Sequence, residues 1–255
     1  MTVCIWCLRE NSTKAIEHII PDALGCPEEF VLTAGVVCEK CNNRLGQVDQ
    51  AVIADIEISA FQAGVPRKNR KQPGIYSYGN LNGGVFENEK FLVLNMDANP
   101  VTTPRGTLVA PFRGRERDVR GDFSTHGTEA TLSFSTDIGR SKKFRRGLVK
   151  IGFEALAYYL GPSVARQSQF DSVRSFVLHG RGERPLMLTH ASDGDYKNQA
   201  WPPFKRGVDY AATFRLAMME ILIDLSPDAS LFPLFREFAE QNMNSSEYTF
   251  LPANA

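Results

Sequence analysis

Apolar residues recur at helical spacing in two long stretches of the chain. In the first stretch they are Val48, Val52, Ile53, Ile56, Ile58 and Phe61. In the second they are Phe144, Leu148, Ile151, Ala155, Leu156 and Tyr159. Intervals of three and four residues put apolar side chains on one helix face. The pattern predicts one helix from about Cys41 to Phe61, with a candidate break at Gly46, and a second from Ser141 to Leu160, before the stop signal Gly161-Pro162.

Outside these two stretches, the residue pattern predicts mainly strands. Between Ile75 and Asp137, short apolar or alternating runs are separated by Gly, Asn and Asp, which is typical of an antiparallel sheet. Beyond the second helix, the pattern predicts a shorter helix at 170–178 and strands at 184–189 and within 210–224. The fold class expected from these elements is α+β.

The five cysteines divide the chain unevenly. All of them lie before residue 42, which indicates a separate N-terminal module. A basic run framed by prolines, from Pro66 to Gly74, is poor in apolar residues and reads as a linker or exposed loop. The sequence therefore predicts a module over residues 1–65 and an α+β region over residues 66–255, whose role would be substrate selection, dimerisation or sensing.

Overall composition limits the classes of partner. Lys and Arg number 29 and Asp and Glu also number 29, so the formal net charge is zero and any nucleic-acid surface must be a local patch. No run approaches the roughly 18 apolar residues of a membrane span, and the first residues do not resemble a signal peptide. These features predict a cytoplasmic protein with no membrane partner.

Four of the cysteines form two pairs with metal-binding spacing. Cys4 and Cys7 make one CxxC pair, and Cys38 and Cys41 make the other. In a reducing compartment such pairs favour a metal over disulfides. Four thiolates would close the coordination sphere of a tetrahedral Zn²⁺ ion and leave no position for a reacting water molecule. The predicted zinc is therefore structural, and the chemistry needs other residues.

Two short motifs accompany the cysteine pairs. Glu17-His18-Ile19-Ile20-Pro21 lies between the pairs, and Asn42-Asn43-Arg44-Leu45-Gly46 follows the second pair directly. In order, spacing and residue type, Cys4 to Asp49 resembles the HNH (ββα-metal) endonuclease superfamily, in its four-cysteine form. The resemblance implies a ββα-metal finger at the N-terminus, followed here by a β-rich and then a helical α+β region.

The same resemblance assigns roles to individual residues. It implies that His18 is the general base, because a neutral imidazole can deprotonate water near pH 7. It implies that Glu17, with Asn42 or Asn43, holds a catalytic Mg²⁺ or Mn²⁺ ion, for which oxygen ligands are suited. Neighbouring positions on a helix differ in direction by about 100°, so both asparagines stay open, and Asn43 is preferred because it precedes Arg44 as in several HNH patterns.

One departure from the family pattern concerns the histidine. The middle Asn of the usual signature is absent between Ser12 and Cys41. A main-chain carbonyl near residues 30–33 is expected to orient His18 instead. Cys26 is expected to be a small residue without a ligand role.

Phosphate contacts are expected from cationic side chains. Arg44 follows the asparagines, and a guanidinium matches phosphate geometry. The densest basic run contributes Arg67, Lys68, Arg70 and Lys71. The combined expectation is a metal-dependent endonuclease that hydrolyses DNA phosphodiester bonds, with RNA as the alternative substrate and a homodimer where both strands are cut. The rival interpretation is a catalytically inactive zinc finger that binds nucleic acid or regulates; a third is a sensor that uses the finger as scaffold.

Overall fold

The structure is a computed structural model of the 255-residue chain. It describes residues 2–62, 75–78, 81–86, 91–95, 101–102, 108–109, 120–126, 129–135, 139, 141–191 and 197–251. Residues 1–68 and 139–255 form one compact unit, and residues 69–138 form another. The expected basic contacts at Arg67, Lys68, Arg70 and Lys71 lie outside the described residues.

The N-terminal part of the first unit consists of two small hairpins and a long helix. Strands β1 (Thr2–Val3) and β2 (Glu10–Asn11) are antiparallel, as are β3 (Glu17–His18) and β4 (Val31–Leu32). The short 3-10 helix η1 (Asp22–Leu24) lies between β3 and β4. Helix α1 (Glu39–Gln62) begins inside the second CxxC pair, and thus one element carries both Cys41 and the Asn-Asn-Arg motif.

The C-terminal part of the first unit is a six-stranded antiparallel sheet with helices. Its strands are β12 (Leu186–His190), β13 (Gln199–Ala200), β14 (Phe204–Arg206), β15 (Asp209–Leu216), β16 (Met219–Asp224) and β17 (Tyr248–Leu251). They lie in the order β13-β15-β16-β12-β17, and β14 also pairs with β15. The helical elements are α2 (Lys142–Leu160), α3 (Pro162–Ala165), η2 (Ser168–Phe170), α4 (Asp171–His179) and α5 (Phe232–Asn242).

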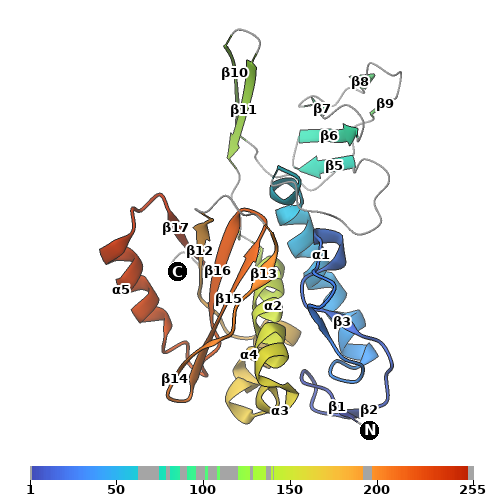
Figure 1. The fold of residues 1–255 in the computed structure, drawn as a ribbon, viewed down its shortest axis with the longest axis vertical. Helices are drawn as coiled ribbons and strands as arrows, with labels where there is room; N and C mark the ends of the chain where they lie inside the picture. Colours follow the sequence, from blue (N-terminus) through green and yellow to red (C-terminus); the bar gives the residue numbers. More distant parts are fainter. Residues whose placement is uncertain are drawn as a thin grey trace. The chain divides into compact units, whose positions relative to one another are not determined.

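Helix α2 is the centre of this unit. It packs on β15 and β16 and also lies along α1 (Figure 1). Ser141 caps its N-terminus by accepting from the backbone N–H of Phe144, and Gly161, at φ 89°, ends it. Every residue from Gly147 to Ala157 is buried, because α2 faces the sheet on one side and α1 on another. A helix covered in this way must bury polar side chains as well as apolar ones.

The second unit contains only strands among its described residues. A three-stranded antiparallel sheet has the order β5 (Ile75–Tyr78), β6 (Leu81–Phe86) and β7 (Phe91–Asn95). Two hairpins follow: β8 (Val101–Thr102) with β9 (Leu108–Val109), and β10 (Arg120–His126) with β11 (Glu129–Ser135). The antiparallel pairing is that expected from the alternating pattern.

The α+β class predicted from the sequence is confirmed, and the long helices lie where the periodicity indicates. Helix α1 is continuous through Gly46, the candidate break. The compact units group residues 1–68 with residues 139–255, in which α1 packs on α2. None of the helices in the described residues is long and apolar enough to cross a membrane.

The close approach of α1 and α2 depends on Gly147. A Cβ atom there would lie 2.3 Å from Val52 Cγ2 and 2.8 Å from the backbone oxygen of Val48. We expect Gly147→Ala to push the helices apart and lower the free energy of unfolding by about 1–3 kcal/mol. Gly46→Ala is the matched control: its Cβ meets nothing within 4 Å, so alanine should stabilise α1 by up to about 1 kcal/mol. Denaturant titration of both variants measures this, and equal effects would contradict the described packing.

Candidate functional site

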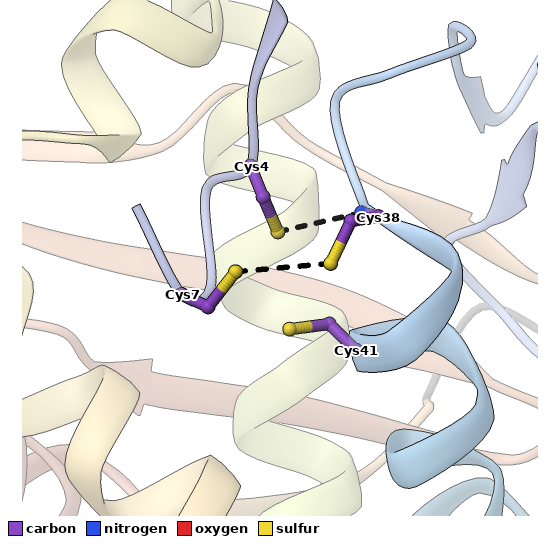
Figure 2. A group of neighbouring side chains, drawn as sticks. All are labelled: Cys4, Cys7, Cys38 and Cys41. Carbon is purple, nitrogen blue, oxygen red and sulfur yellow. Dashed lines mark hydrogen bonds between the residues drawn. The ribbon is translucent and has the colours of Figure 1, made fainter. Parts of the chain in front are cut away.

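The four cysteines of the two CxxC pairs converge on one point. Cys4 and Cys7 come from the turn after β1, and Cys38 and Cys41 from the start of α1 (Figure 2). Their four sulfurs lie within 4.8 Å of one another, and the Sγ atoms of Cys7 and Cys38 are 3.7 Å apart. A tetrahedral ion with Zn–S bonds of about 2.3 Å places its sulfurs about 3.8 Å apart. The cluster therefore has the dimensions of a four-cysteine zinc site.

Backbone amides already favour negative charge at this cluster. The backbone N–H groups of Trp6 and Cys38 each donate to Cys4 Sγ at 3.4 Å. Hydrogen bonding to Cys41 lowers the pKa of Cys4 to about 4, and the same contact raises the pKa of Cys41. Burial raises the pKa of Cys7. Since a metal binds thiolates, it would displace the remaining protons and make binding dependent on pH.

The turn between Cys4 and Cys7 packs against α2. Trp6 is 1% exposed, and its indole Nε1 donates to Glu154 Oε1 at 2.9 Å. Its ring also lies 4.9 Å from that of Phe153, centroid to centroid. The fifth cysteine, Cys26, is not part of the cluster, and its thiol donates to the backbone oxygen of Phe30 at 3.2 Å. The cysteine site is thus connected to the C-terminal part of the unit by packing and by one buried hydrogen bond.

Glu17 and His18 share β3 but differ in surroundings. Glu17 is 5% exposed and points into the protein, whereas His18 is half-buried. Alternation along a strand turns neighbouring side chains to opposite faces. In the register of the hairpin, Glu17 lies opposite Leu32 and His18 opposite Val31. The histidine ring is therefore the member of the pair with access to solvent.

The Glu17 carboxylate meets a lysine from a distant part of the chain. Lys150, on α2, is 0% exposed, and its Nζ donates to Glu17 Oε1 at 2.7 Å. The same ammonium lies 3.1 Å from Asp49 Oδ1, on α1, and 3.1 Å from Glu154 Oε2, one turn along α2. One ammonium thus joins carboxyl groups from β3, α1 and α2. We call Glu17, Asp49, Lys150 and Glu154 the buried ion cluster.

The buried ion cluster contains three carboxyl groups but only one ammonium group, and burial changes the pKa values of Lys150 and Glu154. Burial by itself would lower the pKa of Lys150, but Glu154, Asp49 and Glu17 outweigh it and raise that pKa well above its ordinary value. Burial raises the pKa of Glu154 well above its usual range, although Lys150 opposes the shift. Three carboxyl groups face one ammonium, and Asp49 Oδ1 and Glu154 Oε2 accept no hydrogen bond from the described residues. Coulombic attraction to Nζ is what holds these two oxygens in place.

The asparagines on α1 face different ways. Asn42 is seven residues before Asp49, which is about 20° short of two full turns, so the two share a helix face. Asn42 is half-buried, whereas Asn43 is exposed and about 100° further round the helix. Helix geometry therefore favours Asn42 as the asparagine on the side of the buried ion cluster. No hydrogen bond or ion pair in the described residues joins Glu17 to His18, Asn42 or Asn43.

Arg44 lies on the opposite side of α1 from Asn42. It is exposed, and its Nη2 lies 3.0 Å from Nδ1 of His179, at the end of α4. Together with Gln47 it lines a pocket between α1, α2 and α4. Of the phosphate contacts expected from the sequence, Arg44 is the one whose surroundings the structure describes.

Lys150 is the residue that sequence reasoning missed. Its helix was predicted, and Lys150 and Glu154 are spaced i, i+4 within a segment of apolar residues. A charged pair at that spacing usually lies on a solvated face, so the pattern alone favours exposure. The partners Glu17 and Asp49 are more than 100 residues away in the chain, and no local pattern predicts that pairing.

The residues around Glu17 offer oxygen donors of the type that a divalent cation binds. The buried ion cluster has two more carboxyl groups than ammonium groups, and two of its carboxyl oxygens lack hydrogen-bond donors. Carboxylate and amide oxygens are the donors that Mg²⁺ and Mn²⁺ prefer. Lys150 binds Oε1 of Glu17, and the other oxygen, Oε2, is the candidate ligand atom. In the described residues, the cysteines are the one group of three or more His, Cys, Asp or Glu side chains gathered closely enough to hold an ion.

The cysteine site makes a prediction about metal content. The purified chain should contain about one Zn²⁺, and Cys7→Ser should lose it, because a hydroxyl is a poor ligand where a thiolate is required. Cys26→Ser is the control, since Cys26 lies outside the cluster, and it should keep its zinc. Elemental analysis and thermal melting measure both. Full zinc content and an unchanged melting temperature in Cys7→Ser would show that the assignment is wrong.

The buried ion cluster makes a prediction about stability. Lys150→Met should lower the free energy of unfolding by about 3–5 kcal/mol, because it leaves buried carboxyl groups without their cation. Lys142→Met is the matched control on the same helix: Lys142 pairs with Glu183 at the surface, where such pairs contribute less than about 1 kcal/mol. Chemical denaturation compares them. A loss in Lys150→Met as small as that in the control would contradict a central role for the cluster.

Comparison with known families agrees with the arrangement of these residues. A family model described as HNH endonuclease matches residues 4–56, the segment that contains both cysteine pairs, Glu17, His18 and the first part of α1. No curated protein and no solved structure matches the chain. The match covers about a fifth of the chain and indicates a nuclease in general terms. Residues 4–56 therefore match the HNH endonuclease family model, and their four-cysteine cluster fits a zinc-stapled HNH module.

Proposed function

We propose that this protein is a metal-dependent endonuclease that hydrolyses phosphodiester bonds in DNA. The observation that carries the proposal is the HNH endonuclease match over residues 4–56, which spans the β3 strand with Glu17-His18 and the start of α1. The rest of the unit contributes the buried lysine that holds Glu17 in place. RNA is the alternative substrate, and cutting both strands of a duplex would require two modules, as in a homodimer.

His18 is the proposed general base. Its ring is half-buried on β3, and it can therefore meet both solvent and substrate. A neutral imidazole would accept a proton from the attacking water molecule, which makes the water a better nucleophile. A main-chain carbonyl near residues 30–33, on the partner strand of the hairpin, is the proposed partner that orients the ring.

Glu17 and Asn42 are the proposed ligands of the catalytic cation. Glu17 would contribute Oε2, while Lys150 keeps the carboxylate in one orientation through Oε1. Asn42 would contribute its amide oxygen, and its position on the Asp49 face of α1 supports it over Asn43, the residue preferred from the sequence. When bound, Mg²⁺ or Mn²⁺ would neutralise the charge that develops on the phosphate. A zinc ion bound by four cysteines has no open coordination position, so it could not bind the phosphate.

A second candidate function is a catalytically inactive module that binds nucleic acid. The observation that favours it is the ion pair between Lys150 and Glu17, because an ammonium already compensates the carboxylate that would bind the cation. In that case the finger would be a scaffold and the cationic side chains would supply affinity. CxxC pairs that bind a metal suit a reducing compartment under either function, and we propose that the protein is cytoplasmic.

Cleavage of supercoiled plasmid separates the two functions. With zinc-loaded full-length protein and added Mg²⁺ or Mn²⁺, we expect nicked or linear product. His18→Ala should slow cleavage by about 10²–10⁴-fold, the usual contribution of a general base. His190→Ala is the control, because His190 is an exposed histidine at the end of β12 and should cleave as wild type.

Two results would count against the nuclease assignment. Equal cleavage by His18→Ala and wild type would show that His18 is not the base. If wild type bound DNA yet left plasmid and an RNA of the same sequence intact with either cation, the inactive module would be the better account.

A further inference from the structure

A pocket of about 420 Å³ opens between α1, α2 and α4, and most of its polar lining is cationic. Arg44 comes from α1, Lys143 and Arg146 come from α2, and His179 and Arg181 come from the end of α4 and the turn after it. The volume lies in the range of small-ligand sites, about 300–1,000 Å³. The pocket is made largely by helices outside the matched segment 4–56.

The positive charge of this pocket is not compensated by acidic neighbours. Its described lining contains no Asp or Glu. On the same turns of α2, Lys142 and Arg145 pair with Glu183, at 3.0 and 3.8 Å. The four lining cations Arg44, Lys143, Arg146 and Arg181 form no ion pair within the described residues. In a chain with zero formal net charge, this local excess marks a site for an anion.

Two of the cations, Arg44 and Arg146, are held in position before any ligand binds. Arg146 donates from Nε and Nη2 to the backbone oxygen of Val177, at 2.8 and 2.6 Å, and from Nη2 to that of Leu178 at 3.2 Å. These carbonyls belong to the C-terminal turn of α4, where the helix dipole favours a cation. Arg44 has donors only, so in its 3.0 Å contact Nδ1 of His179 must be the acceptor. The pocket is thus preorganised by contacts across all three helices.

The cationic side chains that line the pocket repel one another. Burial and the charge of Arg44 lower the pKa of Arg146. Burial, followed by the charges of Arg44, Arg181 and Arg146, lowers the pKa of His179. In both groups the neighbouring arginine charges add to the effect of burial, and a bound anion would oppose that electrostatic part. The contact with Arg44 requires that Nδ1 of His179 carries no proton, which the lowered pKa of His179 favours.

We propose that this pocket binds a backbone phosphate of the DNA substrate, on the face of α1 opposite the proposed cation ligand. The inference rests on the proposed function and adds a substrate contact from α2 and α4. Arg44 is two residues after Asn42, so α1 presents the proposed cation ligand on one face and the pocket on the other. Guanidinium groups match phosphate in a bidentate way. A free phosphate ion or a nucleotide has the same chemistry, and the experiment separates these sources.

The experiment measures DNA binding apart from cleavage. Zinc-loaded full-length protein is titrated onto a fluorescein-labelled duplex without added divalent cation, over a range of salt concentrations. The variant is Lys143→Gln/Arg181→Gln, which removes two exposed cations that make no side-chain contact among those described. Lys205→Gln/Arg206→Gln is the control with the same charge change on exposed residues of β14. Unchanged melting temperatures show that all three proteins are folded.

We expect the pocket variant to weaken binding by about tenfold and to flatten the slope of log K against log salt by about 1, because one phosphate contact is lost. The control should match wild type. Equal binding and equal slope in the pocket variant would overturn the proposal. So would calorimetry in which adenosine 5′-monophosphate or inorganic phosphate binds wild type but not the variant, while DNA binding is unaffected.

The same proteins show whether a negative result contradicts phosphate binding in the pocket or the proposed nuclease activity. If wild type cleaves plasmid in a His18-dependent way but the pocket variant binds DNA normally, only the pocket assignment falls. If wild type neither binds nor cleaves DNA, the pocket and the proposed function fall together.

Discussion

The buried ammonium of Lys150 is the constraint on which the first unit depends. It contacts carboxyl groups from β3, α1 and α2, at 2.7 to 3.1 Å, in a place with no access to solvent. A charge in such surroundings is tolerated only when it is paired, so the three elements must meet in one arrangement. Trp6 extends the constraint to the cysteine site, because its indole donates to Glu154. The HNH module is thus fastened to α2 by polar contacts as well as by apolar packing.

These contacts with α2 explain how a module as short as residues 4–56 can hold its side chains in a fixed arrangement. Residues 4–56 contain two-stranded hairpins that are too small to bury much apolar surface by themselves. The four-cysteine cluster fixes the start of α1, and Gly147 lets α2 approach α1 closely. Because α2 also packs on the six-stranded sheet, the orientation of Glu17 is tied to the core of the unit. The cationic pocket comes from the same helices, so the proposed catalytic and phosphate contacts share one rigid frame.

Local patterns in the sequence predicted much of this structure. The CxxC spacing predicted the cysteine cluster, and apolar periodicity predicted α1 and α2, since both signals depend on neighbours within a turn or two. The order of Glu17-His18 and Asn42-Asn43-Arg44 around the cysteine pairs indicated the family. Lys150 and the pocket residue Arg181 were not predicted, because their roles come from tertiary contacts. The sequence left Asn42 and Asn43 open as cation ligands, and our proposal of Asn42 depends on Asp49, which identifies the face of α1 that is turned toward Lys150.

The central claim is that the module holds a catalytic cation in addition to its cysteine site. Electron paramagnetic resonance of Mn²⁺ added to zinc-loaded full-length protein tests it most directly, because bound and free Mn²⁺ give different signals. The account predicts about one bound Mn²⁺ per chain, lost in Glu17→Gln and Asn42→Ala and kept in Asn43→Ala. Mn²⁺ binding that is absent from wild type, or that is unchanged in Glu17→Gln, would contradict it.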